Sequence, residues 1–217
     1  MSDDPETARQ IAELARDDRP LLVLDVDDVL LEFVRPFPRY LETRGFELKL
    51  ASFRLTGNIS ERASGRIPEQ AEVSMLIDAF FQVQSEWQTV IEGAAEAIER
   101  LSAGAEIVLL TAMPHRHRPA RRAHLDALGL PYPLLTTEMA KGPAIAALRG
   151  PAKRPVAFVD DQPRNLLSAQ ESVADAHLFH LMSDNSLRSL LPPPPDNAVV
   201  VDSWNEAKPR IAAALGL

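Results

Sequence analysis

The chain has 217 residues, of which 46% are hydrophobic and 25% are charged, and this composition is typical of one globular domain with a modest insertion. It contains no cysteine, which excludes disulfide bonds, thiolate catalysis and thiolate metal sites. The net charge of −8 argues against binding of nucleic acid polymers. The sequence has neither a long apolar run nor a basic, apolar N-terminus, so we expect a cytoplasmic protein with no membrane partner.

The first predicted elements are a short helix and a strand that ends in acids. Asp4 followed by Pro5 is typical of a helix N-terminus, and an amphipathic helix is expected to continue to about Ala15. An apolar run follows and predicts a buried parallel strand over residues 21–26. The acids at its end are Asp25, Asp27 and Asp28. In open α/β sheets, ligands bind at this end of the strands.

The pattern changes between residues 33 and 87, where no strong signal for a parallel strand occurs. A first helical face consists of Phe33, Phe37, Tyr40 and Leu41. Pro68 opens a second helix, whose apolar residues follow three- and four-residue spacings: Val73, Leu76, Ile77, Phe80 and Phe81. We interpret residues 33–87 as a mostly helical insertion, which leaves residues 1–32 and 88–217 as the main domain.

Helix and strand signals alternate again after residue 93. Strands are expected over residues 106–110, 133–136, 155–159 and 176–181, and helices over residues 94–102, 118–128, 141–148 and 163–172. A stiff proline run at 192–195 precedes an apolar stretch and a final helix near Asn205. Such alternation is typical of parallel βα units, so we expect a three-layer, Rossmann-like α/β fold.

A second pair of acids, Asp160 and Asp161, follows the apolar strand predicted at residues 155–159. Because the carboxyl ends of parallel strands share one edge of a sheet, these acids should converge with Asp25 and Asp27. Several carboxylates in one crevice repel each other unless a cation lies among them. Oxygen ligands in a chain without cysteine favour Mg²⁺.

Four chemical groups follow in order along the predicted strands and helices. They are Asp25-Val26-Asp27-Asp28-Val29, Thr111, Lys141 and Asp160-Asp161. This series resembles the haloacid dehalogenase (HAD) superfamily of phosphotransferases from residue 21 to about residue 181. The insertion at 33–87 then takes the place of that superfamily's cap. Asp28 and Val29 depart from the glycine and threonine that are frequent there, and Asp28 is expected either to add charge near the site or to face solvent.

The resemblance implies roles for four catalytic residues. Asp25 would be the nucleophile that forms an aspartyl-phosphate. Asp27 would protonate the leaving group and then deprotonate the attacking water. Thr111 would donate a hydrogen bond to a phosphate oxygen, and Lys141 would pair with Asp25 and the phosphate.

The resemblance also implies a metal site. Asp160, helped by Asp161, would bind Mg²⁺ together with Asp25 and the backbone carbonyl of Asp27. Asp160 has a second interpretation, as the N-cap of the helix that starts near Pro163.

An acid at position 27 favours a phosphate ester over a haloacid, because the dehalogenases and phosphonatases of the superfamily lack it. We therefore expect a phosphatase acting on a small phosphate ester such as a sugar phosphate or a nucleoside monophosphate. A phosphomutase and a non-catalytic phosphate-binding regulatory module are the alternatives. The basic stretch at 114–118 is interpreted as a solvated helix start, with contact to an anionic substrate as the alternative. Arg54, Arg62 and Arg66 are either substrate contacts or surface charge.

Overall fold

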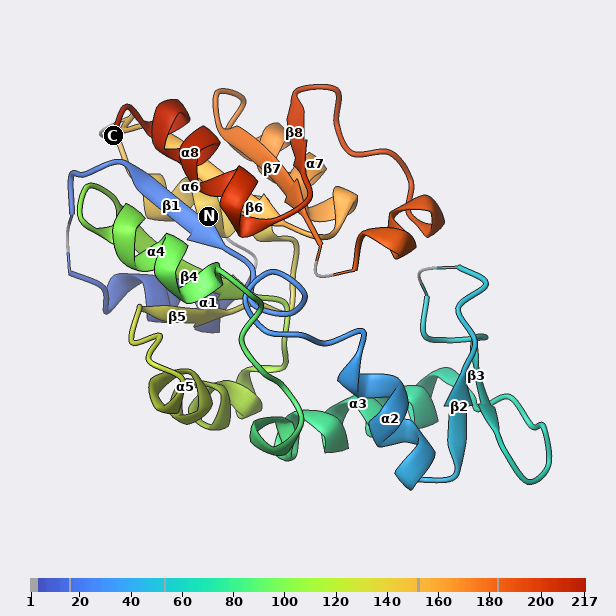
Figure 1. The fold of residues 1–217 in the computed structure, drawn as a ribbon. Coiled ribbons are helices and arrows are strands. Elements are labelled where there is room, and N and C mark those ends of the chain that lie inside the picture. The colour runs from blue at the N-terminus through green and yellow to red at the C-terminus, as the bar shows by residue number, and fades with distance from the viewer. Residues whose placement is uncertain (1–3, 16, 53, 152, 183) are drawn as a thin grey trace.

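A six-stranded parallel sheet forms the centre of the computed structural model, which describes residues 4–15, 17–52, 54–151, 153–182 and 184–217 (Figure 1). The strand order is β5-β4-β1-β6-β7-β8. The strands are β1 (Leu21–Leu24), β4 (Glu106–Thr111), β5 (Leu134–Thr136), β6 (Val156–Asp160), β7 (His177–Leu181) and β8 (Ala198–Val201). Every pairing between neighbours in this sheet is parallel, as the alternating pattern of the sequence predicts.

Strand β1 lies at the point where the order of the strands reverses, between β4 and β6. All four of its residues are fully buried, which explains its unbroken apolar sequence. Leu24 pairs with Leu109 of β4 and with Val159 of β6. Residues that follow these positions therefore emerge together at one edge of the sheet, where a crevice forms at the reversal of strand order.

Helices cover both faces of the sheet and give the expected three layers. They are α1 (Pro5–Ala12), α4 (Ala94–Ser102), α5 (Arg118–Ala127), α6 (Lys141–Arg149), α7 (Pro163–Ser172) and α8 (Trp204–Leu215), with short 3₁₀ segments η2 (His115–His117) and η3 (Asn185–Leu190). One apolar core lies between the sheet and helices α4 and α8. The other lies between the sheet and helices α6 and α7.

Between β1 and α4 the chain forms a separate group of elements: α2 (Pro36–Thr43), β2 (Phe46–Leu48), β3 (Ile59–Glu61), α3 (Gln70–Gln82) and η1 (Gln84–Glu86). Their apolar side chains form a cluster of their own, which also includes Met113 from the main domain. Figure 1 shows this group standing beyond the end of β1. We call it the cap; its predicted boundaries at residues 33 and 87 stay a prediction.

The cap contains an antiparallel pair, β2 and β3, that the sequence did not reveal. Each strand has only three residues, which is too short for a period of two to be visible in the sequence. The helices α2 and α3 agree with the predicted helical faces. None of the helices in the described part of the chain is both long and apolar enough to cross a membrane.

Candidate active site

The loop after β1 places three acids at the edge of the sheet. Asp25 is 6% exposed, and its backbone N–H donates to the Val159 carbonyl at 3.0 Å, which fixes it beside β6. Asp28 has a φ of 59°, a left-handed conformation that glycine adopts more easily. Its carboxylate accepts backbone N–H groups of Phe33 at 2.9 Å and Val34 at 3.0 Å. Asp28 is thus buried and turns the chain into the cap, and the expectation that it faces solvent is wrong.

Lys141 is the first residue of α6, and its side chain is completely buried beneath the acids. Its Nζ lies 2.7 Å from Asp25 Oδ1 and 2.7 Å from Asp160 Oδ2. Burial by itself lowers the pKa of Lys141, but Asp160 and Asp25 outweigh burial and raise that pKa above its usual value. The ammonium is therefore charged at neutral pH and binds the two carboxylates to one another.

Gly142 allows Lys141 to reach this position. A Cβ on Gly142 would lie 2.0 Å from the carbonyl oxygen of Ser168 in α7, which is far inside van der Waals contact. The Ser168 hydroxyl instead accepts the Gly142 N–H at 3.0 Å. The N-terminus of α6 thus packs directly on α7 next to the end of β6.

The two acids that follow β6 have different surroundings. Asp160 accepts hydrogen bonds from the Gln162 backbone at 2.8 Å and the Asn165 amide at 2.9 Å, in addition to Lys141. Asp161 lines the cavity, and its carboxylate accepts a hydrogen bond from Gln162 Nε2 at 2.5 Å. This geometry favours Asp161 as the acid that faces a ligand, whereas the sequence-based prediction gave Asp160 the leading part.

Asp25, Asp160 and Asp161 form a group of acids that is able to hold a metal ion. Each offers a carboxylate oxygen, and these oxygens all lie within 4.8 Å of one another in a buried cluster. Burial raises the pKa of Asp25 to about 7 despite Lys141, and Asp160 and Asp27 add to this effect. Burial, Asp160 and Asp25 also raise the pKa of Asp161 well above its usual value. Lys141 contacts only two of these three buried carboxylates, so the cluster keeps an excess of negative charge, and its donor set fits a divalent cation such as Mg²⁺.

The Asp27 carboxylate points away from this cluster and has two partners of its own. Gln88 Nε2 donates to Asp27 Oδ1 at 2.7 Å. Arg121 Nη2 lies 3.0 Å from the same oxygen, and the Arg121 side chain is fully buried. Arg121 also donates to Gln84 of η1, and its guanidinium lies 5.5 Å from the centre of the Phe81 ring. One buried arginine of α5 thus contacts both Asp27 and the cap.

The role of Arg121 was not predicted, although the sequence contains a signal for it. Arg121, Leu125 and Leu128 follow each other at spacings of four and three residues, which places Arg121 on the apolar face of α5. A charged residue on an apolar face needs a buried partner. The sequence contains no comparable signal that Gln88 and Asn165 contact the acids, because single amide residues occur throughout loops and helices.

The basic stretch at 114–118 contacts the cap. His117 is buried and its Nε2 lies 2.5 Å from Asp78 Oδ1 of α3, while Arg116 Nε donates to the same oxygen at 2.9 Å. The hydrogen bond from His117 is the main cause of a lowered pKa of Asp78. The interpretation of this stretch as a solvated helix start is therefore wrong for His117.

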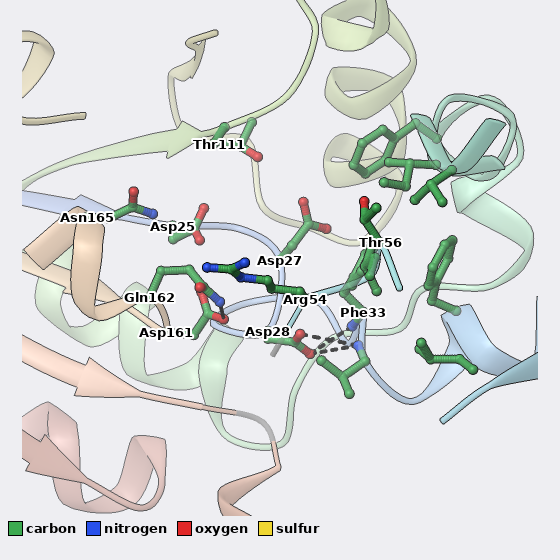
Figure 2. Close-up of a pocket in the computed structure, with 18 of the residues that line it drawn as sticks. Asp25, Asp27, Asp28, Phe33, Arg54, Thr56, Thr111, Asp161, Gln162 and Asn165 are labelled. Atoms are coloured by element: carbon green, nitrogen blue, oxygen red, sulfur yellow. Dashed lines mark hydrogen bonds between the residues drawn. The ribbon is translucent and has the colours of Figure 1, made fainter. Parts of the chain in front are cut away.

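A cavity of about 820 Å³ lies between the acids and the cap. Its lining includes Asp25, Asp27, Thr111 and Asp161. Figure 2 shows Thr111 at the end of its strand beside Asp25, and Arg54 of the cap reaching toward the acids. Lys141 and Asp160 are not part of the lining. The structure thus brings all the predicted site residues to one place, with four of them at the cavity and two beneath it.

No protein-family model and no curated protein sequence matches the chain. Solved structures do resemble it. A HAD family hydrolase from Deinococcus radiodurans R1 with bound phosphate and sodium has 19% sequence identity and a TM-score of 0.58, over 91% of this chain and 97% of that one. A provisionally assigned HAD hydrolase from Bacillus subtilis bound to magnesium has 13% identity and a TM-score of 0.62, over 93% and 100%.

A third similar structure comes from Thermotoga maritima and is provisionally described as a β-phosphoglucomutase. It has 16% identity and a TM-score of 0.59, over 89% of this chain and 99% of that one. Similarity at this level of identity establishes the fold. The chain has the HAD fold, and the resemblance read from its four motifs is confirmed at that level.

Proposed function

We propose that the protein is a Mg²⁺-dependent phosphatase that hydrolyses a small phosphate monoester through an aspartyl-phosphate on Asp25. The observation that carries this proposal is the buried contact of Lys141 with Asp25 and Asp160 at the reversal point of a HAD-fold sheet. A carboxylate at the bottom of a cavity, next to a fixed cation, is suited to attack phosphorus in its ionised form.

In the first step, an Asp25 oxygen forms a bond to phosphorus as the bond to the ester oxygen breaks. Asp27 donates a proton to that leaving oxygen. It then takes a proton from the water whose oxygen bonds to phosphorus while the bond between Asp25 and phosphorus breaks, which releases phosphate and restores the Asp25 carboxylate. Lys141 and the Thr111 hydroxyl stabilise the phosphate oxygens by charge and hydrogen bonding. Mg²⁺, held by Asp25, Asp160, Asp161 and the backbone carbonyl of Asp27, would neutralise further negative charge at the phosphate.

A phosphomutase would share this nucleophile but needs an acid or base on the cap to handle its second hydroxyl. Lys49 is the cap lysine that the sequence offers for this role. Its side chain is 77% exposed, it pairs with Glu47 at 2.7 Å, and it does not line the cavity. The described cap residues that do line the cavity include no histidine, lysine or carboxylate. These observations favour hydrolysis.

The proposal is tested by phosphate release from an aryl phosphate after dialysis against EDTA and after return of Mg²⁺. We expect activity to fall at least roughly 100-fold without metal and to recover with Mg²⁺. Asp161→Asn should raise the Mg²⁺ concentration needed for half-maximal activity by roughly 10- to 100-fold. Asp175→Asn is the matched control, because Asp175 is exposed on the surface beside Arg149. Equal activity with EDTA and with Mg²⁺ would refute the metal dependence.

Replacing Asp27 with asparagine should affect substrates according to their leaving group. An alkyl phosphate releases a basic alkoxide that needs a proton, so kcat/KM should fall by roughly 10²- to 10⁴-fold. A nitrophenyl phosphate releases a stable phenolate, so phosphorylation of Asp25 continues while hydrolysis of the aspartyl-phosphate slows. Rapid-quench kinetics should then show a burst of nitrophenol. The same loss for both substrates, without a burst, would contradict the assigned role of Asp27.

Arg121 is expected to act by positioning Asp27. We predict that Arg121→Met lowers kcat by roughly 10- to 100-fold, because the Asp27 carboxylate loses its fixed orientation. KM should change little, since Arg121 does not line the cavity. Arg122→Met is the control on the same helix: Arg122 donates to the carbonyls of Tyr132 and Leu130 and should affect thermal stability without affecting kcat. Equal kcat in the two variants would exclude a positioning role.

A further inference from the structure

The wall of the cavity opposite the acids is apolar. The cap supplies nine apolar residues to this wall, among them Phe33, Phe37, Leu50, Leu55, Ile77 and Phe81. Figure 2 shows Phe33, one residue of this wall, beyond Asp27 and Arg54, on the side away from Asp25. A phosphate bound at Asp25 would therefore carry its organic part against this wall. We propose that the substrate is a phosphate monoester of a hydrophobic alcohol, an inference that rests on the proposed phosphatase function.

The cap contributes few polar groups to the cavity as a whole. They are Arg54, Thr56 and Gln70. The Thr56 hydroxyl donates to Gln70 Oε1 at 2.8 Å, so these two side chains partly satisfy each other. A sugar has several hydroxyl groups, and each loses hydrogen bonds to water when it is buried without a partner. The sugar phosphate expected from the family resemblance therefore fits this wall poorly.

The apolar wall has surface left for a ligand to cover. Phe33, Leu50, Leu55 and Ile77 are only half-buried in the structure. Phe33 stacks on Phe37 with ring centres 5.0 Å apart and meets Phe80 edge-on at 5.4 Å, so its ring is fixed before any ligand binds. A preformed apolar surface of this kind binds an alkyl or aryl group by removing both from water.

Charge within the cavity is confined to the end where the phosphate would bind. Arg54 and Arg164 are the cations of the described lining. Arg54 reaches toward the acids (Figure 2). Arg164 lies in the first turn of α7, which begins just after Asp161. The apolar wall itself has no charged side chain among the described residues. This distribution suits one phosphate group attached to an uncharged hydrophobic group, and it argues against a second anionic group on the substrate.

The inference is tested with phosphate esters of primary alcohols, because their leaving groups need similar protonation. The series consists of ethyl, butyl and hexyl phosphate with glucose 6-phosphate as the polar member, all with Mg²⁺. We expect kcat/KM to rise roughly fourfold for each added methylene, as transfer of a methylene from water predicts. Hexyl phosphate should exceed glucose 6-phosphate by at least tenfold. A flat series, or a preference for the sugar phosphate, would overturn the inference and leave the phosphatase proposal intact.

Two variants of α3 test whether the dependence of kcat/KM on chain length arises at the apolar wall. Ile77→Gln should reduce the dependence on chain length, because Ile77 lines the cavity. Met75→Gln should leave this dependence unchanged, because Met75 is 70% exposed and does not line the cavity. Both substitutions are on the same helix, and circular dichroism checks that both variants are folded. An identical chain-length dependence in the two variants would contradict the assigned wall.

Binding of alkylphosphonates by calorimetry separates failure of this inference from failure of the phosphatase proposal. Their carbon–phosphorus bond is not hydrolysed, so affinity is measured whether or not turnover occurs. Affinity that rises from methyl- to hexylphosphonate with a negative heat-capacity change supports the hydrophobic pocket. If that rise occurs while none of the esters is hydrolysed, the phosphatase proposal fails and the pocket assignment stands. Affinity that does not depend on chain length overturns the pocket assignment.

Discussion

Replacing Lys141 with methionine is expected to lower the free energy of unfolding by roughly 3–5 kcal/mol, the usual effect of removing one member of a buried ion pair. Without the ammonium, the carboxylates of Asp25 and Asp160 oppose each other in a fully buried site. Phosphate release should fall at least roughly 100-fold in the same variant, because neither the nucleophile nor the phosphate then has its fixed cation.

The loss of stability in Lys141→Met should depend on pH. Burial raises the pKa of Asp25 to about 7, which is above its usual value, so the folded protein takes up a proton that the unfolded chain does not. Such a group destabilises the fold as pH rises from about 4 to 7. Lys141 lowers the pKa of Asp25, so removing Lys141 raises that pKa further, and the variant loses more stability than the wild type as pH increases. We therefore expect a larger loss at pH 8 than at pH 5, in urea denaturation with EDTA present.

Lys49→Met is the matched control for Lys141→Met. The Lys49 side chain is 77% exposed and pairs with Glu47 on the surface of the cap. A surface pair contributes about 0–1 kcal/mol, so the denaturation midpoint should barely change. Equal midpoints for Lys141→Met and Lys49→Met would contradict the central place of Lys141 in the buried cluster.

Replacing Asp25 with asparagine should lower phosphate release at least roughly 10⁴-fold. An amide is a very poor nucleophile, and a water molecule that attacked phosphorus directly would not form the covalent intermediate. The fold should remain, because asparagine has nearly the same shape and removes one of the opposed charges, while Lys141 keeps its contact with Asp160. Cooperative thermal unfolding checks this point. Wild-type turnover in a folded Asp25→Asn protein would exclude Asp25 as the nucleophile.

The strands that end at the site could be predicted because one requirement, burial on both faces of the sheet, determines their sequences. Strands β1 and β6 are buried on both faces, so they consist of apolar residues until acids begin at the edge of the sheet. Once the order of β and α elements is known, the parallel topology brings Asp25, Thr111 and Asp160 together. Lys141 followed from the family resemblance.

Other parts of the site depend on contacts between distant residues, which local patterns do not encode. Asp78 meets His117 across 39 positions, and Asp27 meets Arg121 across 94. The different positions of Asp160, beneath the cavity, and Asp161, in its lining, could not be predicted either, because two adjacent aspartates cannot be distinguished from sequence alone. It results from Lys141 and Asn165, which approach Asp160 from two helices.

The most direct test of the proposed mechanism is to identify the residue that becomes phosphorylated. The Asp27→Asn protein, which should accumulate the intermediate, is mixed with radiolabelled nitrophenyl phosphate and Mg²⁺, quenched in acid and mapped by mass spectrometry. A label on the peptide that contains Asp25, released by hydroxylamine as expected of an acyl phosphate, is the predicted result. A label on a histidine or serine, or a burst of nitrophenol with no labelled protein, would contradict an aspartyl-phosphate on Asp25.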